Sequence, residues 1–309
     1  MINKIFCVIN KSKRRVIFAL HIMIKIKLNI AIKNKYRIFA KRNFNISNRK
    51  VISMRWGLVL QYNGKNYHGW QRQNDDTPTV QGTLCKCFSD ILQEHILVLG
   101  CGRTDTGVHA KNYVAYFDSN NLTEDKKAWL LWKINSYLPH DIRVNHIIRV
   151  PDDFNARFDA LSRTYRYYIT TAKQPFRSDF SWHVPQKLDI TKMNTAARVM
   201  YQYDDFTSLS KGNMQTLTNN CRVLYAHWEK KDEFLIFTIR ANRFLRNMVR
   251  ATVGTLVEVG KGNMTVDEFS EVIKAKSRGK AGASAQAQGL FLEEIEYDKK
   301  IFPRKLFDW

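Results

Sequence analysis

The fold of this chain is read most directly from residues 100–110, Gly100-Cys101-Gly102-Arg103-Thr104-Asp105-Thr106-Gly107-Val108-His109-Ala110. A short apolar run, residues 96–99, leads into this stretch, and a strand-like run, residues 113–117, follows it. Its three glycines let the backbone turn sharply, including through positive φ. The pattern predicts a tight loop between two strands with Asp105 on it, the kind of place where a rigid scaffold often carries functional groups.

The spacing of Arg103 and Asp105 has a chemical use. A carboxylate beside a forked guanidinium stays ionised and is oriented, which suits a nucleophile or a general base. Two other interpretations stay open on chemistry alone, a surface ion pair of small energetic value and a calcium loop, although the other regularly spaced oxygen ligands of such a loop are missing. Cys101 has no obvious base partner, and we expect a small packed residue there.

Residues 102–109 closely resemble the active-site loop of the TruA family of tRNA pseudouridine synthases, with Thr106 where the family usually has alanine. Further motifs resemble those of the same family and follow its order. They are Tyr67–Gln73, Pro151–Phe158 running into Arg163–Tyr167, Phe244–Gly254 with Asn247–Arg250 inside it, and Gly289–Leu292. The resemblance extends from about residue 54 to about residue 297.

The resemblance implies an α+β fold of the pseudouridine-synthase type. Two α/β subdomains with mostly antiparallel sheets would be related by a pseudo-twofold axis, with a cleft between them. Residues 54–156 would form the N-terminal subdomain, which carries the catalytic loop, and residues 157–309 the C-terminal one. It also implies a homodimer whose basic clefts hold the anticodon arm of tRNA.

The implied reaction is the isomerisation of uridine to pseudouridine at tRNA positions 38, 39 and/or 40, with no metal or organic cofactor. By the same resemblance, Asp105 is the nucleophile and Arg103 orients it or takes the place of the flipped base. Tyr165 stacks on the target base and assists proton transfer. Arg250 pairs with the carboxylate or a phosphate, and Leu290 lines the pocket. Whether Asp105 attacks C1′ or C6, or only removes a proton, is not decided by the sequence.

Two other functions compete with this one. The first is a non-catalytic tRNA-binding protein or RNA chaperone that keeps the fold, and the second is the same chemistry on another RNA. The presence of Asp105, Arg103 and Tyr165 together counts against pure binding, because a protein that only binds RNA does not need a carboxylate among phosphates. His68 and His109 lie within motifs, and we expect both to be structural hydrogen-bonding residues rather than bases.

Composition agrees with a soluble, basic, RNA-binding protein. The chain has 309 residues, 44% of them hydrophobic, and a net charge of +22. Residues 54–309 hold 36 basic and 28 acidic residues, so the body remains basic, as a phosphate-binding surface requires. The five cysteines are odd in number and form no Cys-x-x-Cys pair. We therefore expect no disulfide framework or zinc site, and a reducing, cytoplasmic location.

Residues 1–53 contain 14 lysines and arginines and no acidic residue. Their longest nearly apolar run, residues 16–24, is too short to span a bilayer, and we expect no membrane association. The segment could be an organelle import peptide, an RNA-binding arm, or translated upstream sequence preceding a true start at Met54. We favour the last interpretation and expect no stable fold in any of the three cases.

Hydrophobic periodicity places the remaining elements. Strands are expected at residues 55–62, 142–150, 162–171, 221–229, 234–241 and 290–297. Helices are expected from Thr77-Pro78 through Ile91, from about residue 124 to 138, and over residues 190–201, 243–259 and from Thr265, with a loop over residues 277–288.

Three helical details can be tested by structure. In the second helix an apolar stripe is expected, formed by Ala128, Leu131, Trp132, Asn135 and Leu138. In the helix over residues 243–259, one basic face is expected, formed by Arg243, Arg246 and Arg250. The spacing of Thr265 and Glu268 predicts a capping box at the start of the last helix.

Overall fold

A computed structural model describes residues 53–211 and 218–307. The expectations for the segment before residue 53 lie outside these described residues. The strands are β1 (Met54–Tyr62), β2 (Leu99–Gly100), β3 (His109–Ser119), β4 (Ile142–Arg149), β5 (Ser162–Thr170), β6 (Trp182–His183), β7 (Val223–Lys231), β8 (Phe234–Ala241) and β9 (Leu290–Glu296). The helices are α2 (Val80–Leu92), α3 (Lys127–Tyr137), α4 (Ile190–Val199), α5 (Met248–Lys261) and α6 (Val266–Lys274).

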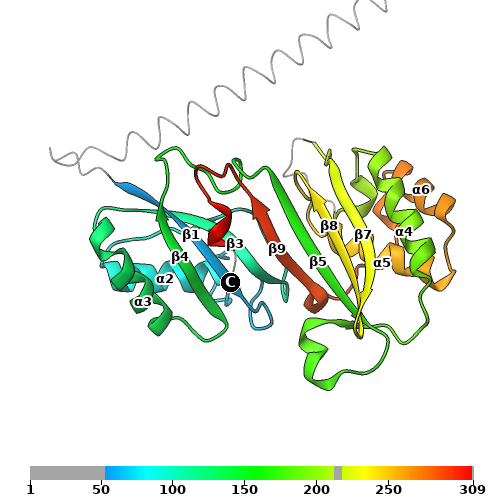
Figure 1. Ribbon diagram of the computed structural model, residues 1–309, viewed down its shortest axis with the longest axis horizontal. Coiled ribbons are helices and arrows are strands. Elements are labelled where there is room, and N and C mark those ends of the chain that lie inside the picture. Colours follow the sequence, from blue (N-terminus) through cyan, green and yellow to red (C-terminus); the bar gives the residue numbers. More distant parts are fainter. Residues whose placement is uncertain (1–52, 212–217, 308–309) are drawn as a thin grey trace, which may run out of the picture. The chain divides into compact units, whose positions relative to one another are not determined.

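One continuous sheet crosses the described part of the chain in the order β4-β1-β3-β9-β5-β8-β7, as Figure 1 shows. Its pairs are antiparallel except β3 with β9 and β5 with β6. Helices α2 and α3 lie at one end of the sheet and α4, α5 and α6 at the other. The prediction of an α+β fold with mostly antiparallel strands is confirmed. The last strand, β9, enters the middle of the sheet and joins its two halves.

Two hydrophobic cores pack against this sheet. The first gathers residues of β1, β3, β4, α2 and α3, with Trp56, Phe88 and Phe117 fully buried. The second gathers residues of β5, β7, β8 and the helices α4, α5 and α6, and it includes Tyr167 and Ile169. These two residues of β5 therefore belong to a packed sheet face. Complete burial of such large apolar groups supplies most of the drive to fold.

The helix expected over residues 243–259 begins later than predicted. Helix α5 starts at Met248, because Asn247 adopts a left-handed conformation with φ of 64°, which asparagine tolerates better than most residues. Arg243 and Arg246 precede the helix, so the predicted basic helical face is wrong. Only Arg250 lies on α5, in its first turn.

The predicted apolar stripe of α3 is correct only in part, because Leu131 and Leu138 pack on the first core whereas Ala128 and Trp132 are exposed. The buried residues of the helix are Leu130 and Ile134. The side chain of Asn135, a member of the predicted stripe, binds the backbone of Val144 on β4 through both its amide groups, and this contact ties α3 to the sheet.

Of two predicted helix starts, that of α6 is confirmed and that of α2 is wrong. Helix α2 begins at Val80 and is capped by Thr79, whose hydroxyl accepts a hydrogen bond from Gly82 N–H, so the start at Thr77-Pro78 is wrong. The capping box of α6 is confirmed, because both reciprocal hydrogen bonds between Thr265 and Glu268 are present.

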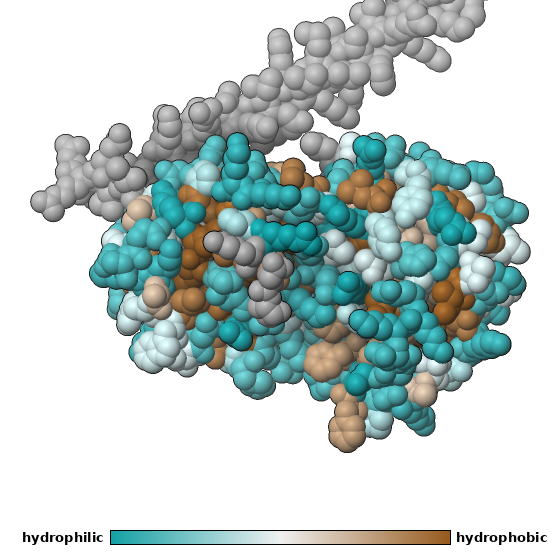
Figure 2. All heavy atoms as spheres, in the orientation of Figure 1, coloured by the Kyte–Doolittle hydropathy of each residue, from teal (hydrophilic) through white to brown (hydrophobic). Residues whose placement is uncertain are grey.

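The surface of the described part is mainly polar. In Figure 2 hydrophilic residues cover most of the face shown, and the apolar patches between them are separate. No helix in the described ranges is long and apolar enough to cross a membrane. Four cysteines are buried and unpaired there, as expected for a chain without disulfides: Cys85, Cys87, Cys101 and Cys221.

Candidate active site

Asp105 lies on the loop that connects β2 with β3, as predicted. Of the three glycines expected to turn this loop, only Gly107 has a positive φ, 78°. Gly100 is required for a different reason, since a Cβ there would overlap the Tyr113 hydroxyl. A Cβ on Gly102 would meet open space. The turn therefore depends on one glycine and the packing on another.

A second loop, residues 63–70, presses against the backbone of the Asp105 loop. Trp70 N–H donates to the carbonyl of Thr104 over 3.3 Å, and Gly107 N–H donates to the carbonyl of Tyr67 over 3.3 Å. Gly69 has a φ of 85°, and a Cβ on it would overlap the Thr104 carbonyl oxygen. These contacts hold the peptide groups on both sides of Asp105.

His109 closes the same loop. Its Nδ1 accepts a hydrogen bond from Gly64 N–H over 3.0 Å, so Nε2 carries the proton and faces the carbonyls of Asp179 and Gln288 at 3.1 and 3.2 Å. Burial lowers the pKa of His109 and favours this neutral form. The structural role predicted for His109 is confirmed, whereas His68 has an exposed side chain.

Arg250 reaches Asp105 from the first turn of α5, a helix of the second core. Its Nη1 lies 3.3 Å from Asp105 Oδ2, and its Nε donates to the carbonyl of Ala285 over 2.8 Å. The backbones of the same two residues are also bonded, because Ala285 N–H donates to the Arg250 carbonyl. The carboxylate side chain remains 27% exposed and the arginine side chain 22%. The pair is thus positioned by backbone contacts while the acid stays accessible.

The segment 281–289 makes this arrangement possible. Its Ala283 carbonyl touches α5 at Gly254, where a Cβ would overlap it. Its Gln286 carbonyl accepts a hydrogen bond from the Tyr167 hydroxyl over 2.6 Å. Ala287 lies against Gly107. The segment fills the space between α5 and the Asp105 loop. The sequence predicts a small, polar, basic loop here, and it gives no sign that these backbone carbonyls have a role.

Tyr165 faces a small pocket beside Asp105. The pocket is lined by Cys101, Gly102, Arg103, Thr104, Tyr113, Arg163, Tyr165 and Leu292. The ring of Tyr165 meets Phe244 edge-on, with ring centroids 5.0 Å apart. Burial chiefly, with a contribution from the Asp105 charge, raises the pKa of Tyr165 and keeps it a neutral phenol. Leu290, which the family resemblance implies as a pocket-lining residue, is not among the residues that line this pocket; it lies in the second core, paired with Tyr167 across β9 and β5, and Leu292 lines the pocket.

Two arginines, Arg103 and Arg163, line this pocket. The guanidinium of Arg163 donates to the carbonyls of Cys101 and Arg157, over 3.2 and 2.6 Å, and to that of Asn242 over 2.9 Å. One side chain thereby ties together three segments that are far apart in the sequence. Arg103, on the Asp105 loop, is exposed.

The chemistry available here is that of a carboxylate. Burial raises the pKa of the Cys101 thiol to about 11, so this cysteine is a packed, protonated residue, as predicted. Residues 53–211 and 218–307 contain no group of three or more His, Cys, Asp or Glu that could hold a metal ion. The accessible carboxylate can act as a nucleophile or a base, with an arginine to orient it and a neutral tyrosine nearby. The arginines that line the pocket can bind a polyanionic substrate.

Comparison with known proteins gives a consistent answer. A sequence profile described as tRNA pseudouridine synthase matches residues 203–298. The tRNA pseudouridine synthase A of Parabacteroides distasonis is 45% identical to this chain over 249 residues, which cover 81% of this chain and 98% of the relative. Those of Bacteroides fragilis and Bacteroides thetaiotaomicron are each 47% identical over 251 residues, which cover 80% of this chain and 98% and 92% of the relatives.

Proposed function

This chain belongs to the TruA family of tRNA pseudouridine synthases and isomerises uridine in tRNA, and we propose that Asp105 is the nucleophile of that reaction. One observation carries the proposal. Asp105 is presented on a loop that is clamped by residues 63–70 on one side and by residues 281–289 on the other, with Arg250 at 3.3 Å.

The reaction defines what the site must do. The bond between N1 and C1′ breaks, a bond between C5 and C1′ forms, the hydrogen on C5 leaves, and N1 gains one. A uridine stacked in a stem must first be flipped out, at a cost of about a few kcal/mol. Asp105 then attacks the flipped nucleotide at C1′ or C6, and the bond that it forms breaks again before pseudouridine leaves, which restores the carboxylate. Arg250 orients the carboxylate oxygen that it contacts.

The other site residues have supporting roles in this proposal. Tyr165 stacks on the flipped uracil and, as a neutral phenol, can donate or relay the proton that moves from C5 to N1. Arg103 is exposed at the entrance, where it can fill the gap that the flipped base leaves. Leu290 anchors β9 in the second core, two residues before Leu292, which lines the pocket.

The larger assembly belongs to the same proposal. Residues 54–156 and 157–309 act as the two subdomains, related by a pseudo-twofold axis. The presence of two hydrophobic cores supports a division into two subdomains, although Leu292, Ile295 and Tyr297 of the second segment pack in the first core. Two copies pair so that their basic clefts hold the anticodon arm of a tRNA in the cytoplasm, with uridines 38, 39 and/or 40 as targets. No metal or organic cofactor takes part.

Mapping of pseudouridine tests the proposal. An unmodified tRNA transcript with uridines in the anticodon arm is incubated with the purified protein and probed for pseudouridine by carbodiimide labelling and primer extension. We expect stops at positions 38, 39 or 40, and none in a matched transcript with cytidines there. Tight binding of the first transcript without any stop would support a binding protein or another RNA substrate instead.

A further inference from the structure

The turn at residues 155–159 carries an aromatic residue that the proposed chemistry does not use. Phe158 is 75% exposed, although large apolar side chains are normally buried. The guanidinium carbon of Arg157 lies 5.5 Å from the centroid of its ring. Single exposed apolar side chains are common on protein surfaces. The contacts that hold this turn and the charges around it distinguish Phe158 from such residues.

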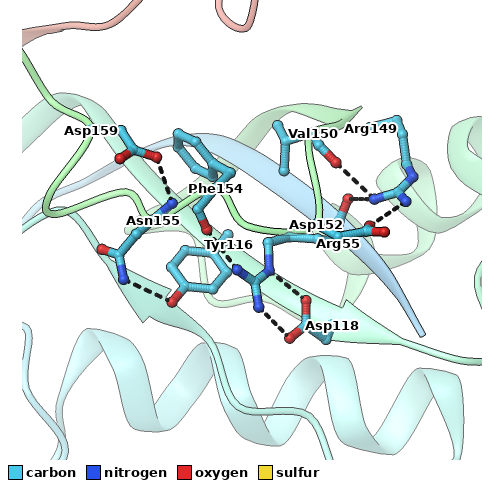
Figure 3. Close-up of polar contacts among 9 residues, drawn as sticks. All are labelled: Arg55, Tyr116, Asp118, Arg149, Val150, Asp152, Phe154, Asn155 and Asp159. Atoms are coloured by element: carbon cyan, nitrogen blue, oxygen red, sulfur yellow. Dashed lines mark hydrogen bonds and ion pairs between the residues drawn. The ribbon is translucent and has the colours of Figure 1, made fainter. Parts of the chain in front are cut away.

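The residues before the turn are fixed to the sheet, as Figure 3 shows. Arg55 on β1 forms a forked ion pair with Asp118 on β3, with distances of 2.7 and 2.8 Å, and donates to the Phe154 carbonyl over 2.7 Å. It also lies over the ring of Tyr116, 4.6 Å from the centroid. The Phe154 side chain is buried in the first core. The chain therefore enters the turn from a rigid base.

The turn itself is closed by its own polar groups. The Asn155 side-chain oxygen accepts hydrogen bonds from the N–H groups of Arg157 and Phe158, over 3.0 and 3.2 Å. Asp159, the acid of the turn, accepts from Asn155 N–H over 2.8 Å. The Ala156 carbonyl is held by the buried Tyr297 hydroxyl over 2.5 Å. This conformation leaves the side chains of Arg157 and Phe158 at the surface.

The turn stands beside the active site. A single guanidinium, that of Arg163, binds the carbonyls of both Arg157 and Cys101, and Cys101 is four residues before Asp105. Partial burial and the neighbouring charges of Arg103, Arg243 and Arg163 lower the pKa of Arg157. Several guanidinium groups thus converge around one exposed ring.

We propose that Phe158 stacks on a base of the tRNA next to the target uridine, while Arg157 contacts the adjoining phosphate. The inference rests on the proposed function. Unstacked RNA bases are commonly held on aromatic side chains, and arginines beside them neutralise the backbone. A flipped uridine leaves its neighbours partly unstacked, so an aromatic ring on the turn that the pocket-lining Arg163 binds can replace the lost stacking. At this cluster of arginines a nucleic acid, which brings phosphates, fits better than a second copy of this basic chain.

The first test measures tRNA affinity at constant salt. We expect Phe158→Ala to raise the Kd by about tenfold or more. Phe158→Trp should retain affinity, and Phe158→Leu, which keeps an apolar side chain without a π-face, should lose as much as alanine. The matched control is Phe176→Ala, at another highly exposed phenylalanine, where the adjacent Arg177 is already paired with Glu233. Unchanged affinity in Phe158→Ala, or full affinity in Phe158→Leu, would overturn the proposal.

A double-mutant cycle identifies the stacked base. Anticodon-arm transcripts are made with one abasic nucleotide at a time on either side of the target uridine, and Kd is measured with wild type and Phe158→Ala. At one position the two losses should fail to add, because the partner of the ring is already absent. Additive losses at every position would contradict stacking, as would conversion of Phe158→Ala from dimer to monomer in sedimentation. Wild-type modification of the intact transcript separates these results from failure of the proposed function, which would abolish modification itself.

Discussion

Two regions of the active site are built in different ways. The floor, which consists of Asp105, Tyr165 and Arg250, is partly buried and held by backbone and core contacts. The rim, which consists of Arg103, Arg157 and Phe158, is exposed. Arg103 and Asp105 are only two residues apart, yet they belong to different regions. From this difference we propose that the chemistry depends on the partly buried groups, which are fixed before the substrate arrives, and that affinity depends on the exposed side chains of the rim.

Loss of the Arg250 charge should produce the largest effect among the predictions for residues around the acid. Arg250→Gln removes the group that orients Asp105, and we expect the single-turnover rate to fall by about 10²–10³-fold with little change in Kd. Rapid-quench measurement with saturating protein gives both values. Arg246→Gln, at an exposed arginine just before α5, should keep the rate. A large change in Kd with a normal rate would place Arg250 in the rim instead.

Tyr165 tests the floor through its ring. We expect Tyr165→Ala to reduce turnover by about 10²-fold, far more than it reduces tRNA binding, since it removes both the stacking surface and the neutral hydroxyl. Tyr165→Phe keeps the ring and separates the two contributions. Equal losses in rate and affinity for Tyr165→Ala would remove its catalytic role.

The clamp formed by residues 63–70 can be broken without touching the floor. Gly69→Ala places a methyl group against the Thr104 carbonyl at a φ of 85°, so we expect about 1–3 kcal/mol lower stability and a roughly tenfold slower reaction. Thermal unfolding and single-turnover assays measure the two effects. Gly279→Ala is the control, because a Cβ there meets no atom within 4 Å. A normal rate in Gly69→Ala would mean that Asp105 needs no such support.

The rim should respond to salt. Arg103→Ala is expected to weaken tRNA binding severalfold and to lower the slope of log Kd against log salt by about one, as for a lost phosphate contact. At saturating protein the rate should stay closer to wild type than in any floor variant. An unchanged slope, with a rate loss that saturation does not relieve, would move Arg103 to the floor.

The smallest effect concerns pH. Burial lowers the pKa of His109, so the unfolded chain takes up a proton more readily than the folded one below about pH 6.5. Stability from this group is complete above that pH and decreases as the pH falls. We expect His109→Gln to flatten the acid-side loss of Tm by about 2–4 °C, and the exposed His68→Gln to leave it unchanged. A steeper loss of Tm at acid pH in His109→Gln would contradict a lowered pKa for His109 in the folded protein.

The elements that were predicted correctly depend on local sequence. The Asp105 loop lies between two short apolar runs, and Thr265 with Glu268 forms a capping box from residues three apart. The features that were missed depend on distant contacts. Nothing local shows that Asn247 is left-handed, that Asn135 anchors α3 to β4, or that the carbonyl of Ala285 holds Arg250. The family resemblance therefore identifies the residues of the floor, whereas the contacts that hold them in place can be seen only in the structure.

Release of tritium from tRNA labelled at C5 of uridine tests the central claim most directly. Wild type and Asp105→Asn are compared at protein concentrations that saturate the transcript, with Kd measured on the same samples. We predict rapid release by wild type and none above background by Asp105→Asn at equal occupancy. Release by Asp105→Asn at a rate near that of wild type would show that another group performs the attack.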